Sequence, residues 1–121
     1  MNIYLCKQCG SMLWQIANGN VPSCCGEEMT LLAPNTTDAA LEKHVPVISK
    51  ADGKLTAKVG STVHPMTEEH SIQWIAAVSD DRVMKKDLKP NEMPELTVCE
   101  HGWHTIYAYC NLHGLWKAEV K

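Results

Sequence analysis

Short stretches in which apolar and polar residues alternate recur along most of this chain. Residues 55–59, Leu-Thr-Ala-Lys-Val, alternate at every position, as expected for a strand that buries one face. Similar patterns predict strands at residues 71–78, 82–88, 95–99, 105–109 and 115–120. We expect an edge strand at 45–48, because Pro46 cannot donate to a strand ladder.

Turn-forming residues separate these segments. Asp52-Gly53 and the cluster Ser79-Asp80-Asp81 are typical of tight connections between strands. Residues 38–43 are expected to form one helical turn. Seven short strands with short connections predict an antiparallel β-sandwich of the immunoglobulin type, in a chain that is mainly β.

Cysteine and histidine divide the chain into two parts. Four of the six cysteines lie in the first quarter, and all six histidines lie beyond residue 40. The segment 33–38, Ala-Pro-Asn-Thr-Thr-Asp, has the composition of a linker. We therefore predict two domains, residues 1–34 and 35–121. The first is too short to bury a core unaided, so we expect a small metal-stapled domain ahead of the seven-stranded sandwich.

Length and charge exclude several classes of protein. The chain has 121 residues and a net charge of −3, with both signs spread along it, which argues against a nucleic-acid partner. It contains no apolar run of membrane-spanning length, and residues 1–7 do not resemble a secretory signal. We expect a cytoplasmic protein without a membrane partner, in which clustered cysteines and histidines bind metal rather than form disulfides.

The first cluster joins a Cys-x-x-Cys motif to an adjacent cysteine pair. Cys6 and Cys9 are separated by fourteen residues from Cys24 and Cys25. Four thiolates suit a tetrahedral zinc or iron site, and the spacing does not choose between the two metals. Two neighbouring cysteines cannot wrap a metal as a second Cys-x-x-Cys would, so we expect a distorted tetrahedron. Disulfides in an oxidising compartment are the alternative.

The second cluster combines histidines with one cysteine. Cys110 and His113 lie three residues apart, so one tight turn can direct both at a single ion. His64 precedes a proline and is restricted to extended conformations, and His70 follows after a short loop. His44 stands at the start of the first strand of the sandwich. These five residues form the second candidate metal site.

Three other residues of the same types receive no role in either site. Cys99 is expected to be a buried strand residue, because free cysteine behaves as a small hydrophobe. His101 and His104 flank Gly102-Trp103 in an expected hairpin connection.

The residues around the second cluster carry a resemblance to a known family. The segments concerned are Glu42-Lys43-His44-Val45-Pro46-Val47, Val63-His64-Pro65-Met66, Glu69-His70-Ser71-Ile72-Gln73-Trp74-Ile75 and Tyr109-Cys110-Asn111-Leu112-His113-Gly114-Leu115-Trp116-Lys117. They closely resemble desulfoferrodoxin, the two-iron superoxide reductase family, whose catalytic domain is neelaredoxin-like. The first thirty-odd residues resemble desulforedoxin, so the likeness covers nearly the whole chain.

The resemblance implies two iron ions per chain. One would be held by Cys6, Cys9, Cys24 and Cys25. The other would have four equatorial nitrogens, from His44, His64, His70 and His113, an axial sulfur from Cys110 and an open sixth position. Lys43 would add positive charge beside this position, and Glu42 would be the carboxylate that can occupy it after oxidation.

The same resemblance implies an enzyme, a superoxide reductase. Superoxide would take one electron and two protons to give hydrogen peroxide, without release of oxygen. A rubredoxin-like carrier would supply the electrons, and the chain would form a homodimer. The first iron would either relay electrons or hold the small domain and the dimer together.

Three alternatives make different use of these residues. A non-catalytic iron-binding electron-transfer protein would keep the four-cysteine site and use the second site only structurally. A dismutase would release oxygen together with peroxide. A disulfide-stapled extracellular module would leave the histidine motifs unexplained.

Overall fold

The computed structural model describes residues 2–36, 41–60 and 64–121, apart from the side chain of Glu42. The chain divides into two compact units, Met1–Ala33 and Pro34–Lys121, one residue before the predicted boundary. Within the described ranges, no helix has the length and apolar character needed to cross a bilayer.

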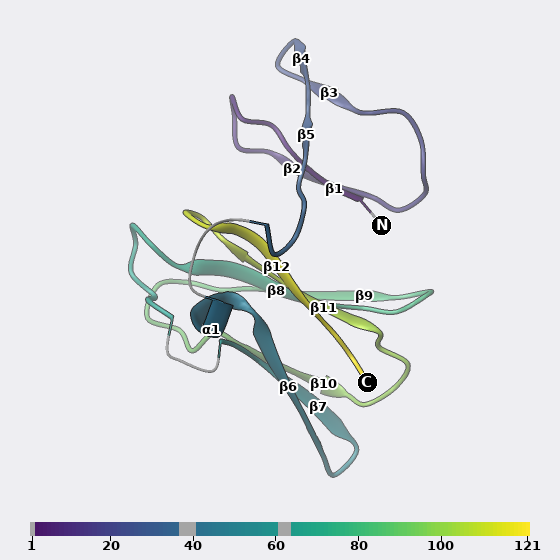
Figure 1. Ribbon diagram of the computed structural model, residues 1–121, viewed down its shortest axis with the longest axis vertical. Helices are drawn as coiled ribbons and strands as arrows, with labels where there is room; N and C mark the ends of the chain where they lie inside the picture. Colours follow the sequence, from purple (N-terminus) through teal and green to yellow (C-terminus); the bar gives the residue numbers. More distant parts are fainter. Residues whose placement is uncertain (1, 37–40, 61–63) are drawn as a thin grey trace. The chain divides into compact units, whose positions relative to one another are not determined.

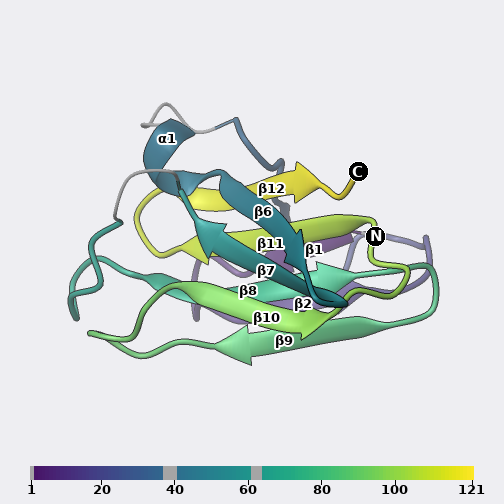
Figure 2. The same ribbon diagram turned by 90° about the horizontal axis from the view of Figure 1, so that it is seen from below.

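The second unit is a β-sandwich of seven strands. They are β6 (Pro46–Ala51), β7 (Lys54–Val59), β8 (Ile72–Val78), β9 (Val83–Asp87), β10 (Glu95–Cys99), β11 (Thr105–Cys110) and β12 (Gly114–Glu119). One sheet has the order β10-β7-β6 and the other β12-β11-β8-β9, with every neighbouring pair antiparallel (Figures 1 and 2). The predicted mainly β fold with a seven-stranded antiparallel sandwich is confirmed, and β6 is an edge strand as expected.

Alternating apolar residues from the two sheets form one core. Leu55, Ala57 and Val59 of β7 are at most 3% exposed, whereas the intervening residues are more exposed. They belong to the same buried cluster as Ile75 and Ile106 of the four-stranded sheet. Removing such side chains from water is the main force that holds two sheets face to face.

The turn signals act as the sequence predicts. Asp52 and Gly53 join β6 to β7 with φ angles of 53° and 73°, and positive values at both positions are typical of a type I′ hairpin. Ser79 closes the turn between β8 and β9, where its Oγ atom accepts a hydrogen bond from the backbone N–H of Arg82 at 3.0 Å.

Two local expectations are wrong, and a third is only partly covered by the described residues. Cys99 is exposed rather than buried, because the alternation along β10 places it on the solvent-facing side. The connection that carries His101 and His104 is not a hairpin, since β10 and β11 belong to different sheets. Of the helical turn expected at 38–43, residues 38–40 lie outside the described residues, and α1 (Leu41–His44) is closed by a 2.9 Å bond from the N–H of Val45 to the carbonyl of Leu41.

The first unit contains five short strands around a very small core. They are β1 (Asn2–Leu5), β2 (Met12–Gln15), β3 (Ser23–Cys24), β4 (Glu27–Glu28) and β5 (Thr30–Leu31). One sheet has the order β2-β1-β5, and β3 pairs with β4. Tyr4, Cys6 and Met29 form its buried cluster. So few buried side chains leave a unit of this size dependent on further cross-links.

Asn35 fastens the first residues of the second unit to β12. Its backbone N–H donates to the carbonyl of Leu115 at 3.0 Å. Its side chain donates to the carbonyl of Lys117 at 3.1 Å and accepts from the N–H of the same residue at 2.8 Å. The φ angle of Asn35 is 62°, in the left-handed region that asparagine tolerates better than most residues.

Replacement of Asn35 by alanine is expected to lower the free energy of unfolding of the second unit by about 2–3 kcal/mol, from two lost hydrogen bonds and left-handed strain. Asn35→Gly loses the same bonds without the strain, so its loss should be about 1 kcal/mol smaller. Denaturant unfolding measures both variants. Equal effects of the two substitutions would show that the backbone conformation of Asn35 contributes nothing.

Candidate metal centres

The five residues of the second predicted site come together at one end of the sandwich. His44 is the last residue of α1, Cys110 ends β11, and His113 lies in the turn before β12. His64 and His70 both belong to the connection between β7 and β8. Figure 2 shows α1, this connection and the β11–β12 turn at the same end of the unit. We call these five residues the His-Cys cluster.

The four imidazole rings form a closed cycle. Their possible metal-binding atoms, with the sulfur of the cysteine, all lie within 4.8 Å of one another. The cyclic order of the rings is His44, His64, His70 and His113. Neighbouring ring centroids are 4.6–5.0 Å apart, and neighbouring planes meet at 77–88°. Such a cycle is the arrangement expected of four nitrogens around one ion.

The nitrogen atoms approach one another closely. The Nε2 atom of His44 lies 3.0 Å from Nε2 of His64 and 3.0 Å from Nδ1 of His113. Nε2 of His70 is buried and has no hydrogen-bond partner among the described residues. A buried, unpartnered nitrogen is costly unless something else binds it, and an ion at the centre of the cycle would do so. The residues present therefore fit a metal ion.

Burial favours the neutral form of two of these imidazoles. His64 is 1% exposed, and burial lowers its pKa to about 4 although a contact with the Pro65 carbonyl opposes the shift. Nδ1 of His64 lies 2.6 Å from that carbonyl, so it carries the proton and leaves Nε2 free to bind metal. Burial also lowers the pKa of His70, with smaller contributions from His113, His44 and Lys43.

Cys110 is completely buried beside this cycle. Its Sγ atom lies 3.9 Å from Nδ1 of His113. Burial raises the pKa of the Cys110 thiol, while backbone N–H groups of His113 and Leu112 that bond to the sulfur oppose the shift. A metal ion must therefore displace this proton to gain a thiolate ligand.

Trp116 supports two members of the cluster. Its indole ring stacks on His44 with centroids 4.8 Å apart and planes 23° from parallel. Its Nε1–H donates to the backbone carbonyl of His113 at 3.0 Å. The sequence predicts no role for Trp116 beyond its place in the segment Tyr109–Lys117. Leu115 and Trp116 are adjacent in β12 and both are buried, so alternation along this strand does not single out Trp116.

Lys43 and Glu42 are the two predicted residues outside the metal-binding set. Lys43 is exposed on α1, directly before His44. Its positive charge contributes to lowering the pKa of His70. The side chain of Glu42 lies outside the described residues, so its predicted role has no structural counterpart here.

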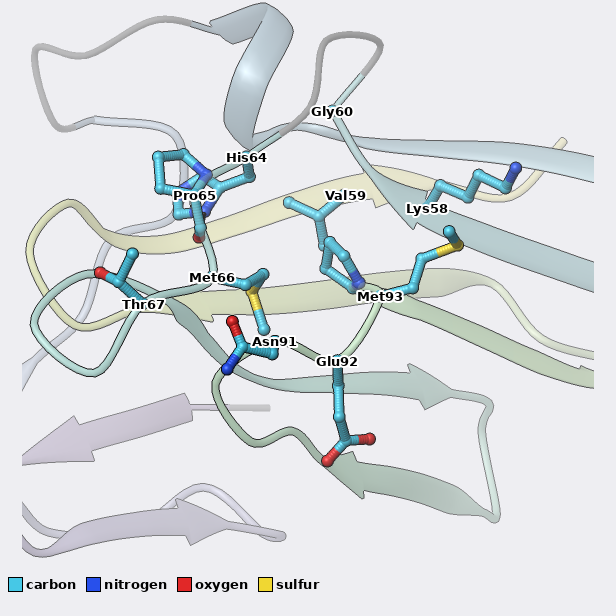
Figure 3. A pocket seen from close by; sticks show the side chains of 11 residues that line it. Lys58, Val59, Gly60, His64, Pro65, Met66, Thr67, Asn91, Glu92 and Met93 are labelled. Atoms are coloured by element: carbon cyan, nitrogen blue, oxygen red, sulfur yellow. Dashed lines mark hydrogen bonds between the residues drawn. The ribbon is translucent and has the colours of Figure 1, made fainter.

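A pocket of about 600 Å³ lies on one side of His64 (Figure 3). Its lining includes the apolar side chains of Val59, Met66 and Met93 and the polar side chains of Asn91 and Glu92. Of the five residues of the His-Cys cluster, His64 is the one that lines it.

The four predicted cysteines of the first site also come together. Their sulfur atoms lie within 4.8 Å of one another, with 3.6 Å between Cys9 and Cys24 and 3.9 Å between Cys24 and Cys25. Cys6 is buried, whereas Cys9 and Cys25 are exposed. Four soft donors at these distances fit a tetrahedral zinc or iron site.

A hairpin turn explains how two adjacent cysteines reach one site. Cys24 pairs with Glu27, so that Cys25 and Gly26 form a two-residue loop. Their φ angles are 53° and 77°, positive at both positions as in a type I′ turn. The left-handed conformation of Cys25 turns its side chain back toward the cluster. This geometry replaces the second Cys-x-x-Cys of a regular zinc ribbon.

The thiols of this first site share hydrogen bonds unevenly. Hydrogen bonding with Ser11, whose Oγ lies 3.3 Å from Sγ of Cys9, lowers the pKa of Cys9 to about 6. Hydrogen bonds with Cys6 and Cys9 raise the pKa of Cys24 to about 12. One thiolate thus exists near neutral pH, which provides a first attachment point for a metal ion.

Comparison with known proteins identifies relatives that span almost the entire chain. The chain is 44% identical to desulfoferrodoxin from Desulfarculus baarsii over 98% of its own length and 96% of the relative. It is 46% identical to desulfoferrodoxin from Nitratidesulfovibrio vulgaris, over 98% of this chain and 95% of the relative.

A solved structure agrees with these sequence matches. The crystal structure of superoxide reductase from Treponema pallidum matches with a TM-score of 0.77 and 31% identity, covering 96% of this chain and 98% of that one. The sequence profile of desulfoferrodoxin matches residues 36–119, which include all five residues of the His-Cys cluster. The chain therefore belongs to the desulfoferrodoxin family.

Proposed function

We propose that this protein is a superoxide reductase with one iron in each cluster. The observation that carries the proposal is the closed cycle of four imidazoles with one thiol beside it, five donors for a single ion. Five protein donors leave one place of a six-coordinate ion for a small substrate, and open positions are typical of reactive rather than structural metals. The match to a solved superoxide reductase supports the same reading.

Iron at the His-Cys cluster would supply a one-electron couple and a binding place for an anion. The protein residues set the charge of that place. Neutral imidazoles and one thiolate compensate only one unit of a divalent ion, which leaves about one positive charge to attract superoxide. Lys43 adds a second positive charge from α1. In the overall reaction, superoxide gains one electron and two protons to give hydrogen peroxide.

The four-cysteine site is proposed to hold the other iron. It either passes electrons on from a rubredoxin-like carrier or serves to hold the small unit together and support a homodimer. The limited core around Tyr4 and Met29 favours a structural contribution in either case.

Product stoichiometry tests the proposed reaction. The iron-loaded, prereduced chain is given a pulse of superoxide, and hydrogen peroxide is counted against superoxide consumed. A reductase gives one peroxide per superoxide, whereas a dismutase gives one per two together with oxygen. A chain that consumes superoxide no faster than its metal-free form would instead be an electron-transfer protein, and the proposal would be wrong.

Lys43→Ala is expected to slow superoxide capture by about three- to tenfold at low ionic strength, because one steering charge is lost. The salt dependence of the rate should become flatter as well. Lys54→Ala is the matched control, since it removes the same charge from the opposite end of the β6–β7 hairpin. Stopped-flow or pulse-radiolysis rates across a salt series measure both. Equal slowing in the two variants would show that Lys43 acts only through the net charge of the protein and not through its position beside the His-Cys cluster.

The raised pKa of the Cys110 thiol predicts how metal binding depends on pH. Between pH 7 and 8 the metal-free cysteine is protonated, so binding releases its proton, and affinity should rise about tenfold per pH unit. Cobalt titration of the His-Cys cluster, followed by absorbance, measures this slope. Cys110→Ala should bind more weakly and with little pH dependence. A steep slope that survives in the variant would show that Cys110 is not a thiolate ligand.

A further inference from the structure

The four histidines of the His-Cys cluster are oriented by different means. The ring of His44 stacks on Trp116, and His64 bonds through Nδ1 to the Pro65 carbonyl. The backbone carbonyl of His113 accepts a hydrogen bond from Trp116. Nε2 of His70 is the atom left for the ion, and no described group hydrogen-bonds to the ring, so the direction of this ring depends strongly on its backbone.

The backbone around His70 is held by two side chains. Thr67 bonds to both backbone groups of His70, accepting from its N–H at 3.1 Å and donating to its carbonyl at 3.2 Å. Asn111 bonds to the two neighbouring residues. Its Nδ2 donates to the carbonyl of Glu69 at 2.9 Å, and its Oδ1 accepts from the N–H of Ser71 at 3.0 Å. Both peptide groups that flank His70 are thus tied to one side-chain amide.

Asn111 occupies the place where the strand ladder ends. β11 pairs with β8 as far as Cys110 and Ile72, with an irregularity just before that pair. One residue further on, the N–H of Asn111 still donates to the carbonyl of Ser71 at 3.3 Å, but the chain then turns toward His113. The side-chain oxygen of Asn111 takes over as the acceptor for the Ser71 N–H. Asparagine can supply both this acceptor and the donor to Glu69.

We propose that Asn111 is a positioning residue that sets the direction of His70 toward the metal. It acts through the backbone on either side of His70 and does not itself touch the ion. Because it follows Cys110 directly and lies two residues before His113, it fixes the β7–β8 connection to the turn that carries two other donors. This inference rests on the proposed metal site.

The test compares metal release from the two centres of the full chain. Protein loaded with iron at both sites is reduced and mixed with a ferrous chelator, and loss from each centre is followed by its own ferric–thiolate absorption after reoxidation. Asn111→Ala removes both side-chain bonds. It is expected to release iron from the His-Cys cluster at least about tenfold faster than the unmodified chain, the usual effect of losing a residue that orients a ligand.

Two further variants separate positioning from general destabilisation. Asn111→Asp keeps the size and the acceptor for Ser71 but sets a carboxylate oxygen against the Glu69 carbonyl, which it repels, so its release rate should still exceed that of the unmodified chain. Asn35→Ala is the matched control, because it also loses one donated and one accepted bond to backbone, on Lys117. Its release rates should not change, and the four-cysteine centre should be unaffected in every variant.

A second readout does not depend on stability. The electron paramagnetic resonance spectrum of the ferric His-Cys centre should change in Asn111→Ala and remain unchanged in Asn35→Ala. An unaltered spectrum and release rate in Asn111→Ala would show that the proposed role of Asn111 is wrong, and so would equally fast iron release in Asn35→Ala. Neither result would affect the proposed function. A chain whose His-Cys cluster takes up no metal would overturn the proposed function as well.

Discussion

The mutual approach of four imidazole rings is the constraint on which the second metal site depends. Nitrogen atoms 3.0 Å apart cannot all carry protons toward one another, so the rings must be largely neutral or share a cation. Burial of His64 favours its neutral form. The strands of the sandwich matter to the site chiefly because their ends, with α1 and one connection, keep these rings together.

Local patterns predicted much of this architecture, because strand alternation and turn chemistry are properties of neighbouring residues. The alternation at residues 55–59 and the Asp52-Gly53 turn are both confirmed. The path from β10 to β11 was predicted wrongly, because it depends on which sheet each strand joins. Cys99 was also predicted wrongly, because the apolar character of a free thiol is outweighed by the alternation along β10. The cyclic order of the histidines and the supporting roles of Trp116 and Asn111 depend on contacts between distant segments, which spacing cannot reveal.

The two clusters differ in how the chain holds their donor atoms together. In the first unit, two tight turns bring four sulfurs together over a short stretch, and positive φ angles at Gly10, Cys25 and Gly26 make those turns possible. In the second unit, the donors come from separate elements and rely on packing and on hydrogen bonds to neighbouring backbone. Damage to the core of the sandwich would therefore disturb the second cluster while leaving the first intact.

This difference has a consequence for how the chain acquires metal during its synthesis. The sulfurs of the first unit are all present once residue 25 has been made, so this unit can take up an ion while the rest is still being translated. The other donors extend to His113, and the rings meet only after β11 has paired with β8 and β12 has paired with β11. The second site therefore binds its metal ion only after the β-sandwich has folded, and not while the chain is being synthesised.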